Sequence, residues 1–337
     1  MLQSCDVRVS KMIWNLIWSP LLSLVCALSS CRLPDHPTSS ALQDELVAKS
    51  NRGLALATFM PSRSYVVVRF FTGQERVIDL KCCPPTEGRT ISRNHLVMVD
   101  TTAAPSIDPI ENPSAFVASL SSLASPIVMI DSKGVIVARS VERFSPTQIA
   151  LSPDLEHFAL VASPPDHPDL PRSVMIGTFQ GKELRKLMNV PSPGHYAYAE
   201  RQPMLDWSPD GRNLLFSHEG AVMLLDADTG KSKKIADGAA AVWSPSGDWI
   251  AYLTLKSEVS LLNLATGASR RIDAGQTSGF PIEWSPAGEY LLIRKQQALP
   301  LYEGRLWVYR ISDGTWAPLP YTATPLLQWH WFQMPIN

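Results

Sequence analysis

The second half of the chain repeats one order of apolar and polar positions. An apolar run ends in Trp-Ser-Pro, a polar turn containing Gly follows, and two further apolar runs are separated by a second turn containing Gly. Copies of this order begin at Trp207, Trp243 and Trp284, and a weaker copy without Trp begins at Leu151. Apolar runs this short, bounded by Pro and Gly, predict β-strands rather than helices.

The two turns explain which residues recur. In the sequence that ends at Gly211, Trp-Ser-Pro-Asp-Gly, Pro fixes φ at the second position of a type I turn, Ser caps the turn and Gly suits its fourth position. The second turn contains Gly230, Gly267 and Gly314 in the three clearest copies. Each copy is therefore predicted to be a four-stranded antiparallel sheet with strands A to D from the inside outwards. The repeat length of roughly 36 to 45 residues is that of β-propeller blades.

The ends of the chain predict how such a propeller closes. No Trp-Ser-Pro strand precedes the first B, C and D strands, whereas the apolar segment Pro325–Trp331 has no blade after it. Joining the two completes an all-β, six-bladed propeller that the C-terminal strand closes, which removes exposed sheet edges. We expect residues 95–120 to supply strands A and B of the second blade; seven blades remain open because residues 84–125 are difficult to assign. The expected B, C and D strands of the first blade are Gly53–Phe59, Tyr65–Phe70 and Arg76–Leu80, and the expected C and D strands of the second are Ile127–Asp131 and Val135–Val141.

The repeat resembles the WSPDG repeats of TolB-type propellers and of the propeller domains attached to prolyl-oligopeptidase-like enzymes. The resemblance is strongest over residues 203–319 and weaker over 126–187. Enzymes of the second group use a separate hydrolase domain with a Gly-x-Ser-x-Gly nucleophile elbow, and this motif is absent from the sequence. Some propellers of this type are metal-dependent pectate lyases, so a polysaccharide lyase stays open as an alternative function.

The N-terminal segment has the order of a secretory signal. Arg8 and Lys11 precede the uncharged apolar run Met12–Leu28, and small residues lead to Cys31. The segment resembles a bacterial lipobox, which implies lipidation of Cys31 and cleavage just before it; an uncleaved signal anchor is the alternative. Arg32 stands where many inner-membrane lipoproteins have Asp, which favours an outer-membrane location. We therefore expect a signal peptide over residues 1–30, a lipidated N-terminus and tether over 31–50, and the propeller over 51–337.

The balance of charges and the positions of His and Cys residues limit the functions that the chain can have. Thirty basic and thirty-one acidic residues leave almost no net charge, so a nucleic-acid partner has no electrostatic support. The seven His residues show no metal-ligand spacing, and we expect no metal and no cofactor. Cys82 and Cys83 are interpreted as loop residues, with a vicinal disulfide or a metal site as alternatives.

Irregular sequence is concentrated in one set of connections. Strands A–B and C–D are joined by short turns, with residues 101–114 as the one expected exception. Binding residues are common in variable loops on a rigid scaffold. The irregular connections are Cys82–Arg93, Ser163–Arg172, Met188–Gln202, Asp273–Phe280 and Lys295–Gly304.

These loops contain side chains that combine aromatic area with polar groups, a mixture that is enriched at binding hot spots. The alternative is that the aromatic residues only pack a long loop onto the disc. The candidate binding residues are His195, Tyr196, Tyr198, Glu200, Arg201, Tyr302 and Arg305.

Together these features predict a non-enzymatic protein that is exported and lipid-anchored to a bacterial membrane, at the outer membrane and periplasm or the cell surface. The expected function is binding or scaffolding of a protein partner. A sensor ectodomain and the lyase are the alternatives.

Overall fold

A computed structural model divides the chain into two compact units, residues 1–37 and 38–337. All the residues that the structure describes belong to the second unit. They are residues 39–60, 65–80, 90–92, 95–99, 125–131, 133, 135–144, 148–163, 172–181, 184–190, 205–218, 220–272, 279–296, 304–323 and 329–334.

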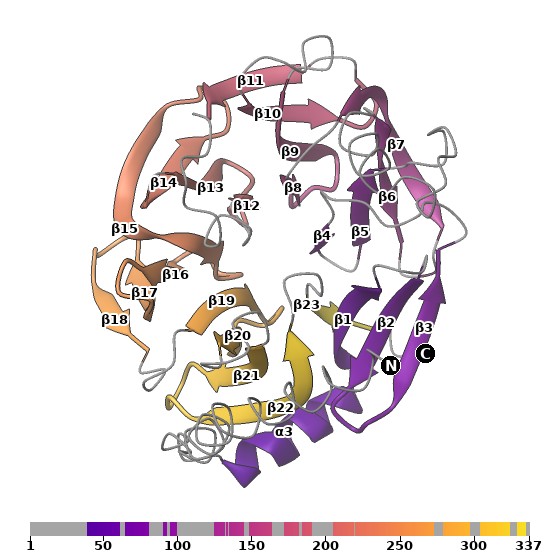
Figure 1. Ribbon diagram of the computed structural model, residues 1–337, viewed down its shortest axis with the longest axis vertical. Helices are drawn as coiled ribbons and strands as arrows, with labels where there is room; N and C mark the ends of the chain where they lie inside the picture. The colour runs from indigo at the N-terminus through magenta and orange to yellow at the C-terminus, as the bar shows by residue number, and fades with distance from the viewer. Residues whose placement is uncertain are drawn as a thin grey trace, which may run out of the picture. The chain divides into compact units, whose positions relative to one another are not determined.

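The described strands form six four-stranded antiparallel blades. In Figure 1 these sheets follow one another around a common centre, with β23, β4, β8, β12 and β19 among the innermost strands. The six-bladed propeller predicted from the repeat is therefore confirmed.

Each of the first three blades consists of four separate strands, which occupy positions A to D in turn. Blade 1 contains β23 (Trp329–Gln333), β1 (Leu54–Met60), β2 (Tyr65–Phe70) and β3 (Glu75–Asp79); blade 2 contains β4 (Thr90–Ser92), β5 (His95–Val99), β6 (Ser125–Ile130) and β7 (Ile136–Phe144); blade 3 contains β8 (Gln148–Leu151), β9 (His157–Ala162), β10 (Ser173–Thr178) and β11 (Leu184–Asn189).

Blades 4 and 5 share one long strand, β15 (Ser232–Trp243). Its first half pairs with β14 as strand D of blade 4, and its second half pairs with β16 as strand A of blade 5. Blade 4 also contains β12 (Leu205–Trp207), β13 (Asn213–His218) and β14 (Ala221–Asp226); blade 5 contains β16 (Trp249–Thr254), β17 (Val259–Asn263) and β18 (Ser269–Arg271); blade 6 contains β19 (Gly279–Trp284), β20 (Tyr290–Gln296), β21 (Gly304–Arg310) and β22 (Trp316–Ala323).

The C-terminal strand closes the ring as the sequence predicts. β23 pairs antiparallel with β1, with Ala57 opposite His330. The strand begins at Trp329, four residues later than the expected Pro325. Trp329 and Trp331 are buried against the apolar face of blade 6, so the last strand contributes to the core as well as to the hydrogen-bonded sheet.

Blade 2 differs from the prediction in its inner strands. Strand A is β4, which begins before residue 95, and strand B is β5. Residues 101–114 consequently belong to the B–C connection between Val99 and Ser125 and are not a long A–B turn. The prediction for blade 2 was wrong because β4 lacks the Trp-Ser-Pro sequence that identifies strand A in blades 4 to 6.

The Trp-Ser-Pro turns have the expected conformation. The Oγ of Ser208 accepts the backbone N–H of Asn213 at 2.9 Å, and its hydroxyl donates to the carboxylate of Asp210 at 2.5 Å. Gly211 has φ +73°, a left-handed conformation that costs Gly less than any residue with a Cβ. The turn therefore requires the side chains that recur in the sequence.

Helix α3 (Ser40–Ser50) covers part of the segment expected to be a tether. Ser39 caps it, with its Oγ accepting the N–H of Leu42 at 3.1 Å. Leu42 and Leu46 are fully buried in the apolar cluster of blade 6, so residues 40–50 are packed on the sheet and are not an extended tether. Among the described residues, no helix has both the length and the apolar character needed to cross a bilayer.

Polar contacts fix the same helix to blade 6. Glu45 accepts hydrogen bonds from the hydroxyl of Tyr290 and from the guanidinium of Arg310. Lys49 forms an ion pair with Glu289, with 2.6 Å between Nζ and Oε2. Burial, followed by the hydrogen bond to Glu45, raises the pKa of Tyr290, so this hydroxyl stays a donor at all ordinary pH values.

Candidate functional site

The ring has two faces that differ in their connections. The A–B and C–D turns lie at one end of each sheet, which we call the turn face, and the B–C and D–A connections lie at the other, which we call the loop face. In blades 3 to 6 the A–B turns are of equal length: residues 152–156, 208–212, 244–248 and 285–289. The turn face is thus formed by short, repeated elements.

Backbone hydrogen bonds join the two turns within each of blades 4, 5 and 6. Ala227 in the C–D turn of blade 4 donates its N–H to the carbonyl of Arg212 in the A–B turn at 2.8 Å. Leu264 donates to Asp248 at 2.9 Å in blade 5, and Ile311 donates to Glu289 at 3.0 Å in blade 6. These bonds hold the two turns of each of these blades together.

Longer connections all lie on the loop face. The segments between β5 and β6, between β9 and β10, and between β20 and β21 are B–C connections. The segments between β3 and β4, between β11 and β12, and between β18 and β19 are D–A connections. The predicted asymmetry between the two faces is confirmed, and it holds without the exception expected at residues 101–114.

Most of the predicted site residues fall outside the described ranges. This applies to His195, Tyr196, Tyr198, Glu200 and Arg201 in the β11–β12 connection, and also to Tyr302, Cys31, Cys82 and Cys83. Arg305 is described: it lies on β21, opposite Lys295 of β20 and Thr322 of β22, and its side chain is exposed. Its position near the start of β21 places it close to the loop face, while its proximity to the residues of the β11–β12 connection stays a prediction.

Polar residues on the inner strands were missed by the sequence analysis. Asp206 accepts the backbone N–H of Trp243 at 2.7 Å, and Glu283 accepts that of Trp331 at 2.8 Å. Each carboxylate therefore bonds to strand A of the following blade. The Nδ1 of His330 lies 3.4 Å from Oε2 of Glu283. These residues could have been recognised by their position, since Asp206, Glu283 and His330 all directly precede a Trp of strand A.

These three residues belong to the scaffold. Both carboxylates are occupied by backbone donors, which ties neighbouring blades together around the centre. The Nε2 of His330 is buried and has no hydrogen-bond partner within the described part of the chain. The two carboxylate bonds assign Asp206 and Glu283 a role in linking neighbouring blades.

A second group of polar residues was also not indicated by the sequence. Ligand atoms of Asp154, Glu156 and His157 lie within 4.8 Å of one another in the A–B turn of blade 3. The carboxylate of Asp154 accepts the hydroxyl of Ser152 and the N–H of Glu156, the same contacts that Asp210 makes in blade 4. Burial acts to raise the pKa of Asp154, but its hydrogen bonds to Ser152, Glu156 and His157 outweigh this and lower it. The contacts of Asp154 are therefore those of the repeat turn.

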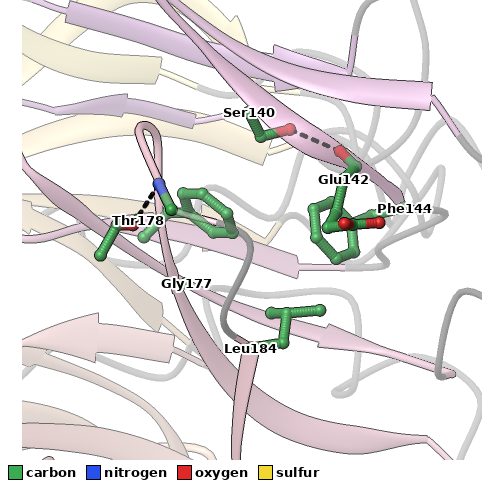
Figure 2. A pocket seen from close by; sticks show the side chains of 8 residues that line it. Ser140, Glu142, Phe144, Gly177, Thr178 and Leu184 are labelled. Carbon is green, nitrogen blue, oxygen red and sulfur yellow. Dashed lines mark hydrogen bonds between the residues drawn. The ribbon is translucent and has the colours of Figure 1, made fainter.

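A shallow crevice with essentially no room for a water molecule lies between blades 2 and 3. Figure 2 shows Ser140, Glu142 and Phe144 of β7 on one side of it, and Gly177, Thr178 and Leu184 of blade 3 on the other. A Cβ at Gly177 would lie 2.7 Å from the ring of Phe158, its partner on the neighbouring strand of blade 3, so this glycine leaves room for that ring. The lining is mostly apolar and contains one carboxylate, so the crevice is a packing feature with no set of reactive groups.

Comparison with known proteins supports the fold. No family model matches the sequence, and no match is found among curated proteins. The structure is similar to TolB from Acinetobacter baumannii, with a TM-score of 0.54 and 14% identity over 82% of this chain and 66% of that chain. It is also similar to a structure described as TolB from Agrobacterium tumefaciens, with a TM-score of 0.52 and 13% identity over 84% of this chain and 99% of that chain. At this level of identity the similarity shows a TolB-like propeller fold, as the repeat resemblance implied.

Proposed function

We propose that this chain is a protein-binding or scaffolding propeller that works outside the bacterial cytoplasm. The observation that supports the proposal is the difference between the two faces of the ring. Short turns close the turn face with internal hydrogen bonds, whereas all the longer connections emerge on the loop face. A rigid frame that presents variable loops on one side is a common arrangement for binding.

Hydrogen bonds between neighbouring inner strands support this proposal. The indole N–H of Trp207 donates to the carbonyl of Ala150, that of Trp284 to Val242, and that of Trp331 to Glu283, at 3.2 to 3.3 Å. Each of these bonds joins strand A of one blade to strand A of the preceding blade. Such a frame holds the ends of the connections in place, so the frame itself need not reorder when a partner binds.

The loop-face hypothesis is tested by substituting three residues of the β11–β12 connection. We expect Tyr196→Ala, Tyr198→Ala and Arg201→Ala, combined in one variant, to abolish capture of the partner identified by cross-linking to the native protein in intact cells. Aromatic and Arg side chains often contribute about 2 kcal/mol or more each at such surfaces. The melting temperature should change by only a few degrees, since exposed substitutions cost about 0.5 kcal/mol or less.

A matched variant on the turn face serves as the control. Arg212, Lys231 and Asp248 are exposed in turns of blades 4 and 5, and their combined replacement by Ala should leave capture intact. Full capture by the loop-face variant would refute the site. A large fall in its melting temperature would instead show that the aromatic residues pack the loop onto the disc.

We also propose that the protein is anchored through a lipid on Cys31. The support is the sequence order from Arg8 and Lys11 through the apolar run to Cys31. Cys31→Ala should move the protein into the soluble fraction and remove labelling by a palmitate analogue. Unchanged membrane retention in this variant would favour an uncleaved signal anchor.

A further inference from the structure

Helix α3 is held at the turn face at both of its ends. The backbone N–H of its cap, Ser39, donates at 3.1 Å to the carbonyl of Trp316, the first residue of β22 after the C–D turn of blade 6. At the other end, Oγ of Ser50 accepts the N–H of Phe71, in the C–D turn of blade 1, at 2.7 Å. In Figure 1 the helix runs beside β22 towards blade 1. The described chain therefore enters the ring at the turn face.

Contacts along the helix keep this entry point in place. Lys49 pairs with Glu289 in the A–B turn of blade 6, and Glu45 bonds to Arg310 at the end of β21, directly before the C–D turn. The fully buried Leu42 adds an apolar contact to the same blade. A helix held by buried apolar contacts and by polar contacts at both ends does not swing to the other face without breaking them.

The chain between Cys31 and this entry point is short compared with the height of the ring. Eight Cα–Cα steps separate Cys31 from Ser39, and a fully extended chain covers about 28 Å in that number of steps. Strand β20 has seven residues and runs from the turn face to the loop face, a height of about 23 Å.

This difference in length restricts how an anchored ring can stand. If the loop face lay against the membrane, the chain from Cys31 would have to run the whole height of a blade before it reached Ser39. Only about 5 Å would then remain for the loop-face connections. One of these connections links Val99 to Ser125. The opposite orientation places Ser39 on the side of the membrane and needs no extension of the chain.

We propose that the short tether holds the ring with its turn face towards the membrane and its loop face towards the aqueous phase. This inference rests on the lipid anchor at Cys31 proposed above. It also specifies the partner of the loop face, which is a protein that approaches through the aqueous phase and not one embedded in the same membrane beside the anchor.

One strand offers a matched pair of reporter positions. Lys231 directly precedes β15 at the turn face, and Asp237 on β15 lies opposite Ala221 at the loop face. Both side chains are exposed, and six residues of strand separate them by about 20 Å. They lie in blade 4, which is across the ring from the seam between blades 6 and 1 where α3 is attached.

The test measures the distance of each reporter from the lipid surface. Lys231→Cys or Asp237→Cys, each combined with Cys82→Ser and Cys83→Ser, carries a fluorescent donor. The full-length gene is expressed in a bacterium, and the lipidated protein is inserted into preformed phosphatidylcholine vesicles with an acceptor dye on the headgroups. We expect energy transfer to place the Lys231 donor about 20 Å nearer to the acceptors than the Asp237 donor.

A longer tether is the control. Thirty Gly and Ser residues inserted after Thr38 give the chain from Cys31 a mean span of about 34 Å, which exceeds the height of the ring. The difference between the two donors should then disappear. A difference that survives the insertion would overturn the proposal, because the short tether would not set the orientation. Equal distances without the insertion, as in a ring standing on its edge, or a nearer Asp237 donor would also overturn it.

The same preparations separate this proposal from the anchoring on which it rests. Protein without a palmitate label overturns the lipid anchor and the orientation together. Labelled, membrane-bound protein with the wrong order of distances overturns the orientation alone. Melting temperatures are compared with the native protein, and Ser246→Cys with Lys256→Cys, in exposed turns on the two faces of blade 5, provides a second pair if a blade 4 variant fails to fold.

Discussion

The tryptophan residues that end strand A make contacts that differ from blade to blade. The indole of Trp284 donates to the carbonyl of Val242 at 3.3 Å. The equivalent indole N–H of Trp243 is buried and has no hydrogen-bond partner within the described residues. Burying an unpaired donor costs free energy, so two residues at the same repeat position contribute differently to stability.

This difference predicts the outcome of a matched pair of substitutions. Trp284→Phe should lower the free energy of unfolding more than Trp243→Phe does, by about 1 kcal/mol, because only the first leaves a buried carbonyl unpaired. Both remove the same volume, so the cavity cost is similar. Urea unfolding of the two variants measures the difference; equal losses would show that the indole bond to Val242 contributes nothing.

Among the elements, the Trp-Ser-Pro turn of blade 4 is expected to respond to acid. The hydroxyl of Ser208 and the N–H of Arg212 donate to the carboxylate of Asp210 and lower its pKa. As the pH falls below the ordinary aspartate pKa of about 3.9, the unfolded chain takes up a proton before the folded chain does. The contribution of this turn to stability is therefore present near neutral pH and is lost in acid.

Blade 5 provides a natural comparison, since Ser246 occupies the position of Asp210. Asp210→Ser should reduce the fall in melting temperature between about pH 5 and pH 3, and Ser246→Asp should increase it. Both variants are measured by thermal unfolding across this range. Parallel curves for the two variants would mean that the acid sensitivity arises elsewhere in the protein.

The elements also show where sequence reasoning succeeds. The sequences of the turns identified blades 3 to 6, because Trp, Pro and Gly determine the conformation and packing of the residues directly beside them. It could not reveal that helix α3 packs on blade 6, since Leu42 and Leu46 meet Tyr290, Leu306 and Ala317, which are distant in sequence.

The candidate site was predicted less completely than the fold. The asymmetry of the two faces followed from the lengths of the connections and was confirmed. The links from Asp206 to Trp243 and from Glu283 to Trp331 could not be derived, because they depend on how neighbouring blades are aligned.

For the whole molecule, closure by the last strand is the decisive feature. Deleting residues 325–337 removes β23 and leaves β1 as an open inner edge, and it also removes the buried side chains of Trp329 and Trp331. We expect this truncation to lower the melting temperature strongly and to cause aggregation, which light scattering detects. Deleting only residues 335–337 is the control and should have little effect. A monomeric 325–337 deletion with an unchanged melting temperature would contradict closure.

The continuous strand β15 limits how this propeller can change in evolution. Repeat proteins gain or lose whole units, which requires that a unit can be cut out at both of its boundaries. β15 has no such boundary, because its residues near Ser232 complete blade 4 while its residues near Trp243 begin blade 5. Removing either blade alone would require a cut inside this strand. We therefore expect these two blades to be inherited together, whereas the separate strands β11 and β12 leave a boundary between blades 3 and 4 at which a unit can be gained or lost.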